Sequence, residues 1–487
     1  MLEALKAVDY KKVFYFFSEL AAIPHGSGNV GAMADYLENF AKERNIRYNR
    51  DSADNIIFYK PATEGYEALP TVILQGHMDM VCEKDADSDH DFTKDGLKLM
   101  FDGEWLSADK TTLGGDDGIA VAYCLALLED TEAKHPALEM IITTEEEVGM
   151  DGAKALDGSL LSGKYMINID SEEEHMVLCG CAGGMRVTAE LPMERVIAGG
   201  RRVQVALRGL LGGHSGVEID KGRTNAVLFL ARYLFTLRDK VSFLLEEYSG
   251  GQKDNAIPRE ADAVLVFREE TAEEDLLVAR QLAAALTEEI RSGEPEAAFI
   301  LTMEEEAVPE VPVVHPRSFE KFLFLLMQTP NGVQTMSSDI PGLVESSLNL
   351  GICKLEAMKA VCLWSLRSSK KSYLHYLRDK LMYLAGFLGA DCEPSAEYPG
   401  WEYRTESKLR DVYTATYEEL FGKKPELATI HAGLECGLLN EKIPGLDCIS
   451  IGPDMKDIHT PAERLHVESS LRIYRLLEKL LADGRIS

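Results

Sequence analysis

Histidine and carboxylate side chains recur in this sequence shortly after short apolar runs. His77 and Asp79 follow the first run, Glu147 follows the second, Asp170 ends the third, and His459 lies in the loop after the fourth. A single histidine in a loop is usually a surface residue, but this recurrence favours a metal site. Imidazole nitrogens and carboxylate oxygens are ligands that zinc, manganese and cobalt accept in proteins. The pattern predicts a site for divalent cations such as zinc, manganese or cobalt.

The number of candidate ligands fits two ions. A catalytic ion takes about three protein ligands and keeps one position for water. Asp116, in a glycine-rich turn before an apolar stretch, adds a further carboxylate. If Asp116 bridges two ions, His77 and Asp170 complete the ligands of one. Glu147 and His459 then complete the ligands of the other.

Glu146 and Asp79 lie next to the predicted ligands without being needed as ligands themselves. A water held between two ions roughly 3.5 to 4 Å apart is a nucleophile at neutral pH. Glu146 is the candidate general base, which accepts the proton of that water and passes it to the leaving amine. Asp79, two residues after His77, is placed to orient that imidazole. Glu145 is left without a role, and on its own the run 145–147 would be read as a solvated group of charges.

An α/β architecture must bring these side chains together. In open parallel sheets, functional groups lie on loops just past the carboxyl ends of the strands. We therefore expect the loops that follow the apolar runs to meet at one edge of a sheet. The expected buried strands are Thr71–Gln75, Met140–Thr143, Met166–Ile169 and Cys448–Ile451, and the expected helices around them are Tyr10–Ala22, Val30–Arg44, Ile119–Leu128 and Lys408–Phe421.

The chain of 487 residues is too long for one ordinary core, and its pattern changes twice. After Gly184, alternating apolar and polar segments are separated by helical stretches, which is typical of an antiparallel sheet with one face towards solvent. The first pattern returns near Glu393. We expect a catalytic α/β domain with a mostly parallel central sheet, formed by 1–184 and 393–487, and an inserted α+β lid or dimerisation domain at 185–392.

Five polar residues outside the metal set are candidates for binding the substrate. His214, flanked by glycines, could close over the site and stabilise an oxyanion, although a flexible turn would look the same. Asn255 and Arg367 could bind a terminal carboxylate, since the guanidinium fork fits one, but Arg367 could equally lie on a surface strand. His431 and Glu435 are four residues apart and, on a helix, would share one face and could hold an amine or a side chain of the substrate. An ordinary acidic residue at a helix start is the alternative for Glu435.

Composition excludes several other classes of function. The formal charge of −30 disfavours nucleic acid as a partner, and no apolar run approaches the roughly 20 residues of a membrane helix. The nine cysteines are an odd number without a CxxC pair, which indicates reduced thiols. The first 20 residues are amphipathic and lack the apolar segment of a secretion signal, so we expect a cytoplasmic protein.

Several motifs carry a resemblance to a known family. Gly76–Met80, Glu145–Gly149, Ile169–Asp170 and His459 resemble the motifs of the di-zinc exopeptidase and aminoacylase family of metallopeptidases. The resemblance implies a catalytic domain with an inserted lid, two metal ions, and a homodimer formed through the lid. Further strings resemble a subgroup that hydrolyses dipeptides with a free amino end, including carnosine-like Xaa-His substrates: Asp170–Glu174, Gly180–Gly184, Gly212–Gly216, Asn255–Arg259, His431–Cys436 and Ile451–Pro453.

The chain departs from this subgroup at Asp117, where relatives commonly have asparagine. Either Asp116 or Asp117 could therefore bridge the ions, and the surrounding glycines favour Asp116. Two other functions remain alternatives to a metallodipeptidase. One is an aminoacylase or amidohydrolase that acts on N-acyl amino acids, and the other is a metal-binding scaffold without catalysis.

Overall fold

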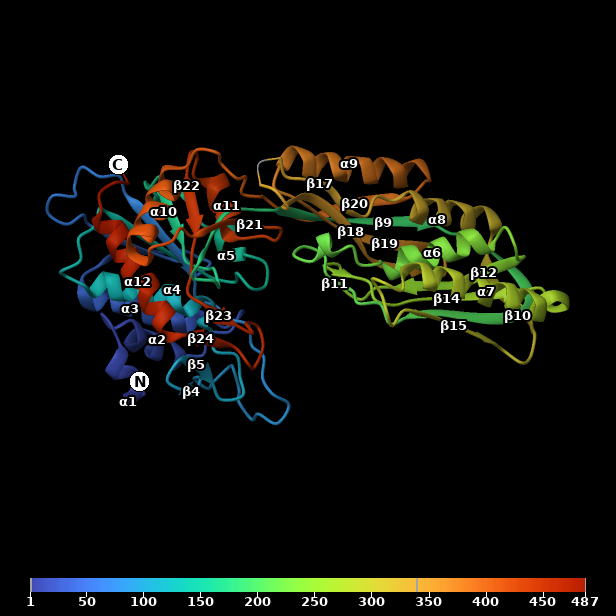
Figure 1. Cartoon of the computed structure of the whole chain (residues 1–487), viewed down its shortest axis with the longest axis horizontal. Helices are drawn as coiled ribbons and strands as arrows, with labels where there is room; N and C mark the ends of the chain where they lie inside the picture. The colour runs from blue at the N-terminus through green and yellow to red at the C-terminus, as the bar shows by residue number, and fades with distance from the viewer. Residues whose placement is uncertain (1, 339, 487) are drawn as a thin grey trace. The chain divides into compact units, whose positions relative to one another are not determined.

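The computed structural model describes residues 2–338 and 340–486, and the chain divides into two compact units (Figure 1). Unit 1 consists of Met1–Cys181, Trp401–Thr429 and Leu434–Ser487. Unit 2 consists of Ala182–Gly400 and Ile430–Gly433. The segment 185–392, expected as an inserted domain, lies within unit 2.

Unit 1 is built on an eight-stranded sheet with the order β1-β2-β6-β3-β7-β22-β8-β21. Its central strands β6, β3, β7 and β22 pair in parallel, and antiparallel strands flank them. The predicted α/β fold with a mostly parallel central sheet is confirmed. The strands are β1 (Arg47–Arg50), β2 (Ile56–Lys60), β3 (Val72–His77), β6 (Leu138–Thr143), β7 (Tyr165–Asn168), β8 (Met176–Cys181), β21 (Glu426–Ile430) and β22 (Asp447–Ser450).

The central strands form where the sequence has continuous apolar runs. Strands β3 and β6 are buried at every position, which is typical of parallel strands covered on both faces. Apolar side chains of α2, α3, α4, α10 and α12 join those of the sheet in one core. The helices of unit 1 are α1 (Glu3–Val8), α2 (Val13–Ala21), α3 (Gly31–Arg44), α4 (Gly115–Glu129), α5 (Asp151–Ala155), α10 (Lys408–Phe421), α11 (Glu435–Lys442) and α12 (Val467–Ala482).

A separate four-stranded sheet of unit 1 has the order β23-β24-β5-β4. Its strands are β4 (Leu99–Phe101), β5 (Trp105–Ala108), β23 (Met455–Lys456) and β24 (Arg464–His466). Strands β23 and β24 pair in an antiparallel manner, so residues 457–463 form a hairpin loop between them. We refer to this segment as the 457–463 loop.

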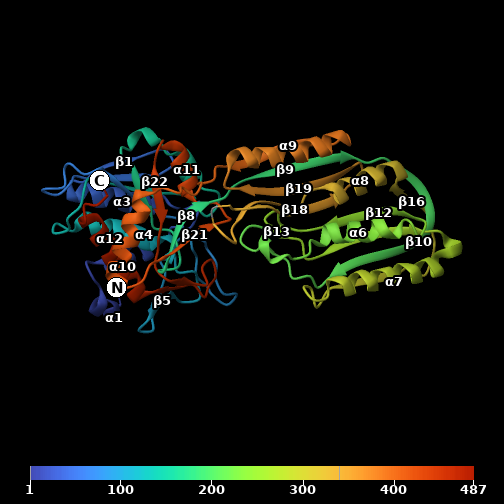
Figure 2. The same ribbon diagram turned by 45° about the horizontal axis from the view of Figure 1, so that its top comes forward.

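Unit 2 is built on a ten-stranded antiparallel sheet. The main order is β15-β10-β14-β12-β18-β19-β9-β20, with β16 beside β10 and β17 beside β18. The helices α6, α7, α8 and α9 share one apolar core with one face of this sheet (Figure 2). The bounds are β9 (Gly183–Pro192), β10 (Arg195–Arg208), α6 (Ala226–Leu237), β12 (Phe243–Gly250), β14 (Ala261–Phe267), α7 (Ala272–Ile290), β15 (Ala298–Met303), β16 (Val308–Val314), α8 (Pro316–Gln328), β17 (Gly332–Met336), β18 (Val344–Leu355), β19 (Lys359–Ser368), α9 (Lys371–Phe387) and β20 (Asp391–Tyr398).

Unit 2 also contains a short ribbon of two antiparallel strands, β11 (Gly213–His214) and β13 (Ala256–Ile257). His214 pairs with Ala256 in this ribbon, which places the turn at Asn255 next to His214.

No helix among the described residues combines the length and apolarity needed to cross a lipid bilayer.

Candidate metal centre

Five different segments of unit 1 present the predicted metal ligands. His77 is the last residue of β3, and Asp170 is the second residue after β7. Glu147 lies in the turn between β6 and α5, and Asp116 lies in the first turn of α4. His459 belongs to the 457–463 loop. The ends of the parallel strands thus supply three of the five ligands, as expected of this type of sheet.

The first group of candidate ligands is His77, Asp116 and Asp170. The Nε2 atom of His77 lies 3.1 Å from Oδ1 of Asp116 and 3.5 Å from Oδ1 of Asp170. All three ligand atoms fall within 4.8 Å of one another. Such a cluster of one imidazole and two carboxylates can hold one divalent cation.

The second group is Asp116, Glu147 and His459. The Nε2 atom of His459 lies 3.2 Å from Oδ2 of Asp116 and 3.0 Å from Oε1 of Glu147. Asp116 therefore turns one carboxylate oxygen towards His77 and the other towards His459. That arrangement suits a carboxylate shared by two cations.

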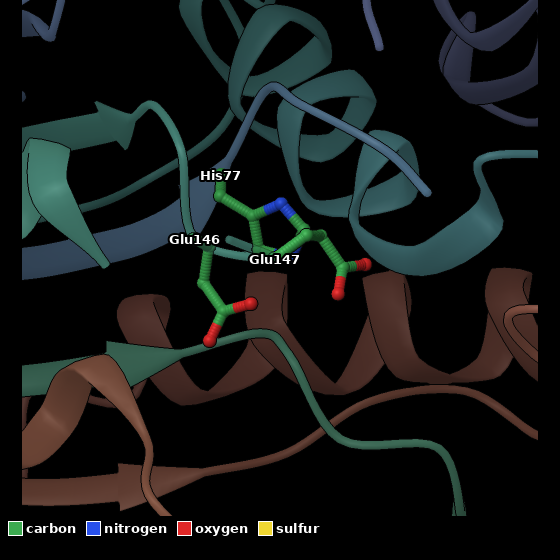
Figure 3. Close-up of side chains that lie close together, drawn as sticks. All are labelled: His77, Glu146 and Glu147. Atoms are coloured by element: carbon green, nitrogen blue, oxygen red, sulfur yellow. The ribbon is translucent and has the colours of Figure 1, made fainter. Parts of the chain in front are cut away.

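A third group joins His77 and Glu147 with Glu146. Figure 3 shows the carboxylates of Glu146 and Glu147, which are consecutive residues of one loop, near the ring of His77. Glu146 belongs to neither of the other two groups. Its carboxylate therefore lies beside the candidate metal site without being required by it.

Negative charge is crowded in this part of unit 1. Burial raises the pKa of Asp170 to about 8 and the pKa of Glu146 well above its usual value. Hydrogen bonds to Asp116 and Glu147 raise the pKa of His459 to about 11. In the described part of unit 1, no lysine or arginine forms an ion pair with these carboxylates. Both the donor atoms and the number of carboxylates therefore fit divalent cations.

Asp79 fixes both His77 and the loop that carries the glutamates. The Nδ1 atom of His77 lies 2.9 Å from the backbone oxygen of Asp79 and 3.5 Å from its Oδ1 atom. The carboxylate of Asp79 accepts hydrogen bonds from the backbone N–H groups of Glu146 and Glu147, at 3.0 and 3.3 Å. Ser27, which the sequence did not single out, donates its hydroxyl to the same carboxylate at 2.8 Å. A lone serine in a loop carries no signal of such a contact.

The carboxylate of Asp117 contacts the backbone of His77 instead of joining the candidate ligand atoms. Its Oδ2 atom accepts a hydrogen bond from the backbone N–H of His77 at 3.2 Å, and a Cβ atom at Gly76 would lie only 2.4 Å from it. Burial raises the pKa of Asp117 well above its usual value. The peptide bond between Asp116 and Asp117 is cis. Among the described residues, Asp117 belongs to none of the candidate ligand groups, so the geometry favours Asp116 as the bridge.

Glu435 is fully buried at the first position of α11. Its Oε2 atom accepts hydrogen bonds from Nε2 of Gln75 at 2.5 Å and from Oγ1 of Thr143 at 2.6 Å. Gln75 is two residues before His77, and Thr143 is the last residue of β6. Burial raises the pKa of Glu435 to about 7. These contacts favour a role in joining the ends of β3 and β6 over direct contact with the substrate.

The expectation that His431 and Glu435 share one face of a helix is wrong. Helix α11 begins only at Glu435, because Leu434 has an extended backbone with φ −140° and ψ 152°. His431 belongs to unit 2, where its Nε2 atom lies 2.7 Å from Oγ of Ser347. Burial lowers the pKa of His431 to about 3, so its ring is neutral at pH 7.

Unit 2 gathers His214, Arg367 and His431 in one neighbourhood, since the charge of Arg367 adds to burial in lowering the pKa of both histidines. Arg367 is only 7% exposed and donates from Nη1 to the hydroxyl of Tyr398 at 2.9 Å. The alternative of a surface position for Arg367 is therefore wrong. Asn255 is exposed in its turn, and its backbone oxygen accepts a hydrogen bond from Ser215 at 2.8 Å.

The ring of His214 is held in one tautomer. Its Nδ1 atom accepts hydrogen bonds from the backbone N–H groups of Gly216 and Val217, both at 3.2 Å. A neutral imidazole that accepts at Nδ1 carries its proton on Nε2. The turn 212–216 is thus ordered, and the N–H of His214 is on Nε2.

Comparison with known proteins agrees with these observations. The sequence model of peptidase family M20/M25/M40 matches residues 73–483. The chain is 38% identical to the cytosol non-specific dipeptidase of Escherichia coli strain K12 over 487 residues, which is 99% of each chain. The crystal structure of an aminoacylhistidine dipeptidase from Vibrio alginolyticus is similar with a TM-score of 0.88 and 35% identity, and the match covers 98% of this chain and 99% of that one.

A more distant structure shares the fold alone. The aminopeptidase PepT of Bacillus cereus is similar with a TM-score of 0.57 and 16% identity, over 97% of this chain and 98% of that chain. Because the likeness spans nearly the full length of both proteins, both units described above belong to the shared fold.

Proposed function

The chain belongs to peptidase family M20/M25/M40 and is a dipeptidase, and we propose that it uses two metal ions to hydrolyse dipeptides with a free amino end, including Xaa-His. The observation that carries this proposal is the pair of ligand groups that share Asp116. The dipeptidase names of the relatives from E. coli and V. alginolyticus support the class of substrate.

The residues of unit 1 divide the chemical work between them. His77, Asp116 and Asp170 would hold one ion, and Asp116, Glu147 and His459 would hold the other. The ions, with zinc as the first expectation and manganese or cobalt as alternatives, would polarise the scissile carbonyl and activate water.

Proton transfer and orientation fall to two residues that hold no ion. Glu146 accepts a proton from the attacking water and delivers it to the nitrogen of the leaving amine. Asp79 keeps the His77 ring and the glutamate loop in place through the contacts described above.

Unit 2 supplies groups that suit other parts of a dipeptide. The Nε2–H of His214 would donate to the oxyanion that develops during amide hydrolysis. Arg367 can pair with the terminal carboxylate, with Asn255 as a further polar contact. His431 is neutral and therefore suits a hydrogen-bonding role at the substrate side chain better than an ionic one.

Loss of the Arg367 side chain should weaken binding of substrates that have a free carboxylate. A hydrogen bond to a charged group contributes about 1.5 to 3 kcal/mol, so we expect Arg367→Ala to raise KM roughly 10- to 150-fold for a dipeptide. The same variant should change KM much less for the dipeptide amide, which lacks that charge. Tyr398→Phe is the control, because it removes the hydroxyl that Arg367 contacts and leaves the guanidinium. Equal losses on the acid and on the amide would disprove the assignment.

Metal removal tests the proposed function as a whole. We expect dialysis against a chelator to abolish hydrolysis of a panel of dipeptides that includes Xaa-His. Separate addition of zinc, manganese and cobalt should restore it and rank the metals. N-acetyl amino acids are the contrasting substrates, because an aminoacylase accepts them and a dipeptidase that requires a free amine does not. Turnover by the chelated protein, or preference for the N-acetyl compounds, would refute the proposal.

We retain a cytoplasmic location and a homodimer as proposals. The name of the E. coli relative, a cytosol dipeptidase, supports the location. Helix α9 of unit 2 supports the dimer, because Tyr383 and Phe387 on its surface are 80% and 79% exposed. Large exposed aromatic side chains often mark contacts between proteins. Sedimentation equilibrium gives the mass of the assembly and decides between monomer and dimer.

A further inference from the structure

Glu463 is a buried carboxylate at the end of the 457–463 loop, and it has no role in the mechanism above. It is 3% exposed. Its Oε2 atom accepts hydrogen bonds from the backbone N–H groups of Leu113 and Gly114, at 2.7 and 3.3 Å. Its Oε1 atom accepts one from Gly115 at 2.8 Å. One side chain thus binds three consecutive N–H groups of a segment about 350 residues earlier in the chain.

These three N–H groups belong to the turn that presents Asp116. The first N–H groups of a helix have no partner within the helix and need an acceptor. Helix α4 begins at Gly115, and its N-cap residue, Gly114, has no side chain that could serve. Glu463 fills that place, and its negative charge is favourable at the positive end of the helix. The next residue after the three bound N–H groups is Asp116.

Glu463 itself belongs to the 457–463 loop, which also contains His459. Asp457 and His459 both have left-handed backbones, with φ 55° and 60°. Such a conformation is unfavourable for a residue other than glycine and persists only where the surrounding structure fixes it. Within the loop, the N–H of Glu463 donates to the backbone oxygen of Thr460 at 3.0 Å. Glu463 is therefore anchored at one end beside His459 and at the other end beside Asp116.

We propose that Glu463 is a positioning residue that sets the separation of Asp116 and His459, and so fixes the second group of metal ligands. The proposal rests on the two-ion function proposed above. Without the carboxylate, the N–H groups of the α4 turn lose their acceptor and the 457–463 loop loses its attachment to that turn. Asp116 and His459 would then no longer be held at the 3.2 Å separation that the structure shows.

The chain offers a matched control for a purely structural effect. Glu139 is also buried, at 5% exposure, and its carboxylate accepts hydrogen bonds from the backbone N–H groups of Ser162 and Gly163 at 2.9 to 3.0 Å. Glu139 is the second residue of β6, whereas the metal ligands follow the carboxyl end of that strand. The change Glu139→Gln therefore disturbs a similar set of hydrogen bonds to the backbone, but at the opposite end of β6 from the candidate metal ligands.

The experiment is a titration of the full-length apo-protein with Co²⁺, followed by calorimetry and by visible absorption. We expect the wild-type protein to bind two ions. Glu463→Gln should weaken one of the two binding steps by roughly 10- to 100-fold, as loss of a group that orients a ligand does. The visible absorption of the Co²⁺ ion bound in that step should also differ from that of the wild type. Glu139→Gln should bind both ions as the wild type does, even if its melting temperature falls as far as that of Glu463→Gln.

The outcomes separate the inference from its premise. Two normal binding steps in Glu463→Gln would overturn the inference, as would an equal weakening in Glu139→Gln. A wild-type protein that binds fewer than two ions would instead overturn the two-ion function, and the inference with it. Glu463→Asp is the second variant if Glu463→Gln does not fold. It keeps the charge but is one methylene shorter, so we expect the same binding step to be weakened.

Discussion

The change Glu146→Gln is expected to lower kcat by roughly 100- to 10,000-fold while the protein keeps both metal ions. The amide has the size of the carboxylate but cannot take a proton from the attacking water. Glu146 belongs only to the third ligand group, so the two groups that share Asp116 stay complete without it. Steady-state kinetics and metal analysis on the same preparation measure the two quantities.

The neighbouring residue gives the control for this variant. Glu145 lies in the same turn, and its carboxylate accepts a hydrogen bond from the backbone N–H of Gly28 at 2.9 Å. Glu145→Gln keeps an oxygen for that contact, so we expect little change in kcat. Unimpaired turnover in Glu146→Gln would exclude it as the general base. Loss of an ion in that variant would show that it is a ligand instead.

The strands that carry the ligands could be predicted because they leave a strong signal. Parallel strands buried on both faces favour consecutive apolar residues, and β3 has them at Val72–Leu74 and β6 at Met140–Ile142. Polar residues within a few positions after such a run lie at the edge of the sheet. His77 and Glu147 could be assigned to one site by this reasoning, although nearly 70 residues separate them.

The relation between His431 and Glu435 could not be predicted from their spacing. Two residues four apart meet on one face only if a helix covers both. Because the backbone of Leu434 is extended, α11 begins only at Glu435, four residues after His431. The sequence does not fix the first residue of a helix, so the prediction that one helix covers both residues was wrong.

The residues that contact the ligand-bearing segments could not be predicted from the sequence either. Glu463 accepts hydrogen bonds from backbone N–H groups just before Asp116, and Ser27 donates to the side chain of Asp79. Every residue except proline has a backbone N–H, so such a partner leaves no mark in the sequence. Candidate metal ligands can be recognised by residue type, whereas the residues that contact those ligands are found only in three dimensions.

The identity of the bridging residue lies between these two cases, and a pair of variants can decide it. Asp116→Asn should lower the affinity for metal ions by more than the roughly 10- to 100-fold typical of groups that only orient ligands. One oxygen of Asp116 faces His77 and the other faces His459. An asparagine offers a single oxygen and no charge, so at least one ion loses a ligand and both lose the shared negative charge. Hydrolysis should fall at least as far as in Glu146→Gln.

Asp117→Asn is the matched change one residue away, and we expect it to keep both ions and most of the activity. The oxygen of an asparagine can still accept the N–H of His77, as Oδ2 of Asp117 does at 3.2 Å. Asparagine also has the same size, which matters because the carboxylate of Asp117 packs closely against Gly76. The reverse result, with both ions lost in Asp117→Asn and retained in Asp116→Asn, would move the bridge to Asp117. Because the two variants make the same chemical change in adjacent residues, a difference in bound metal identifies the carboxylate that contacts the ions.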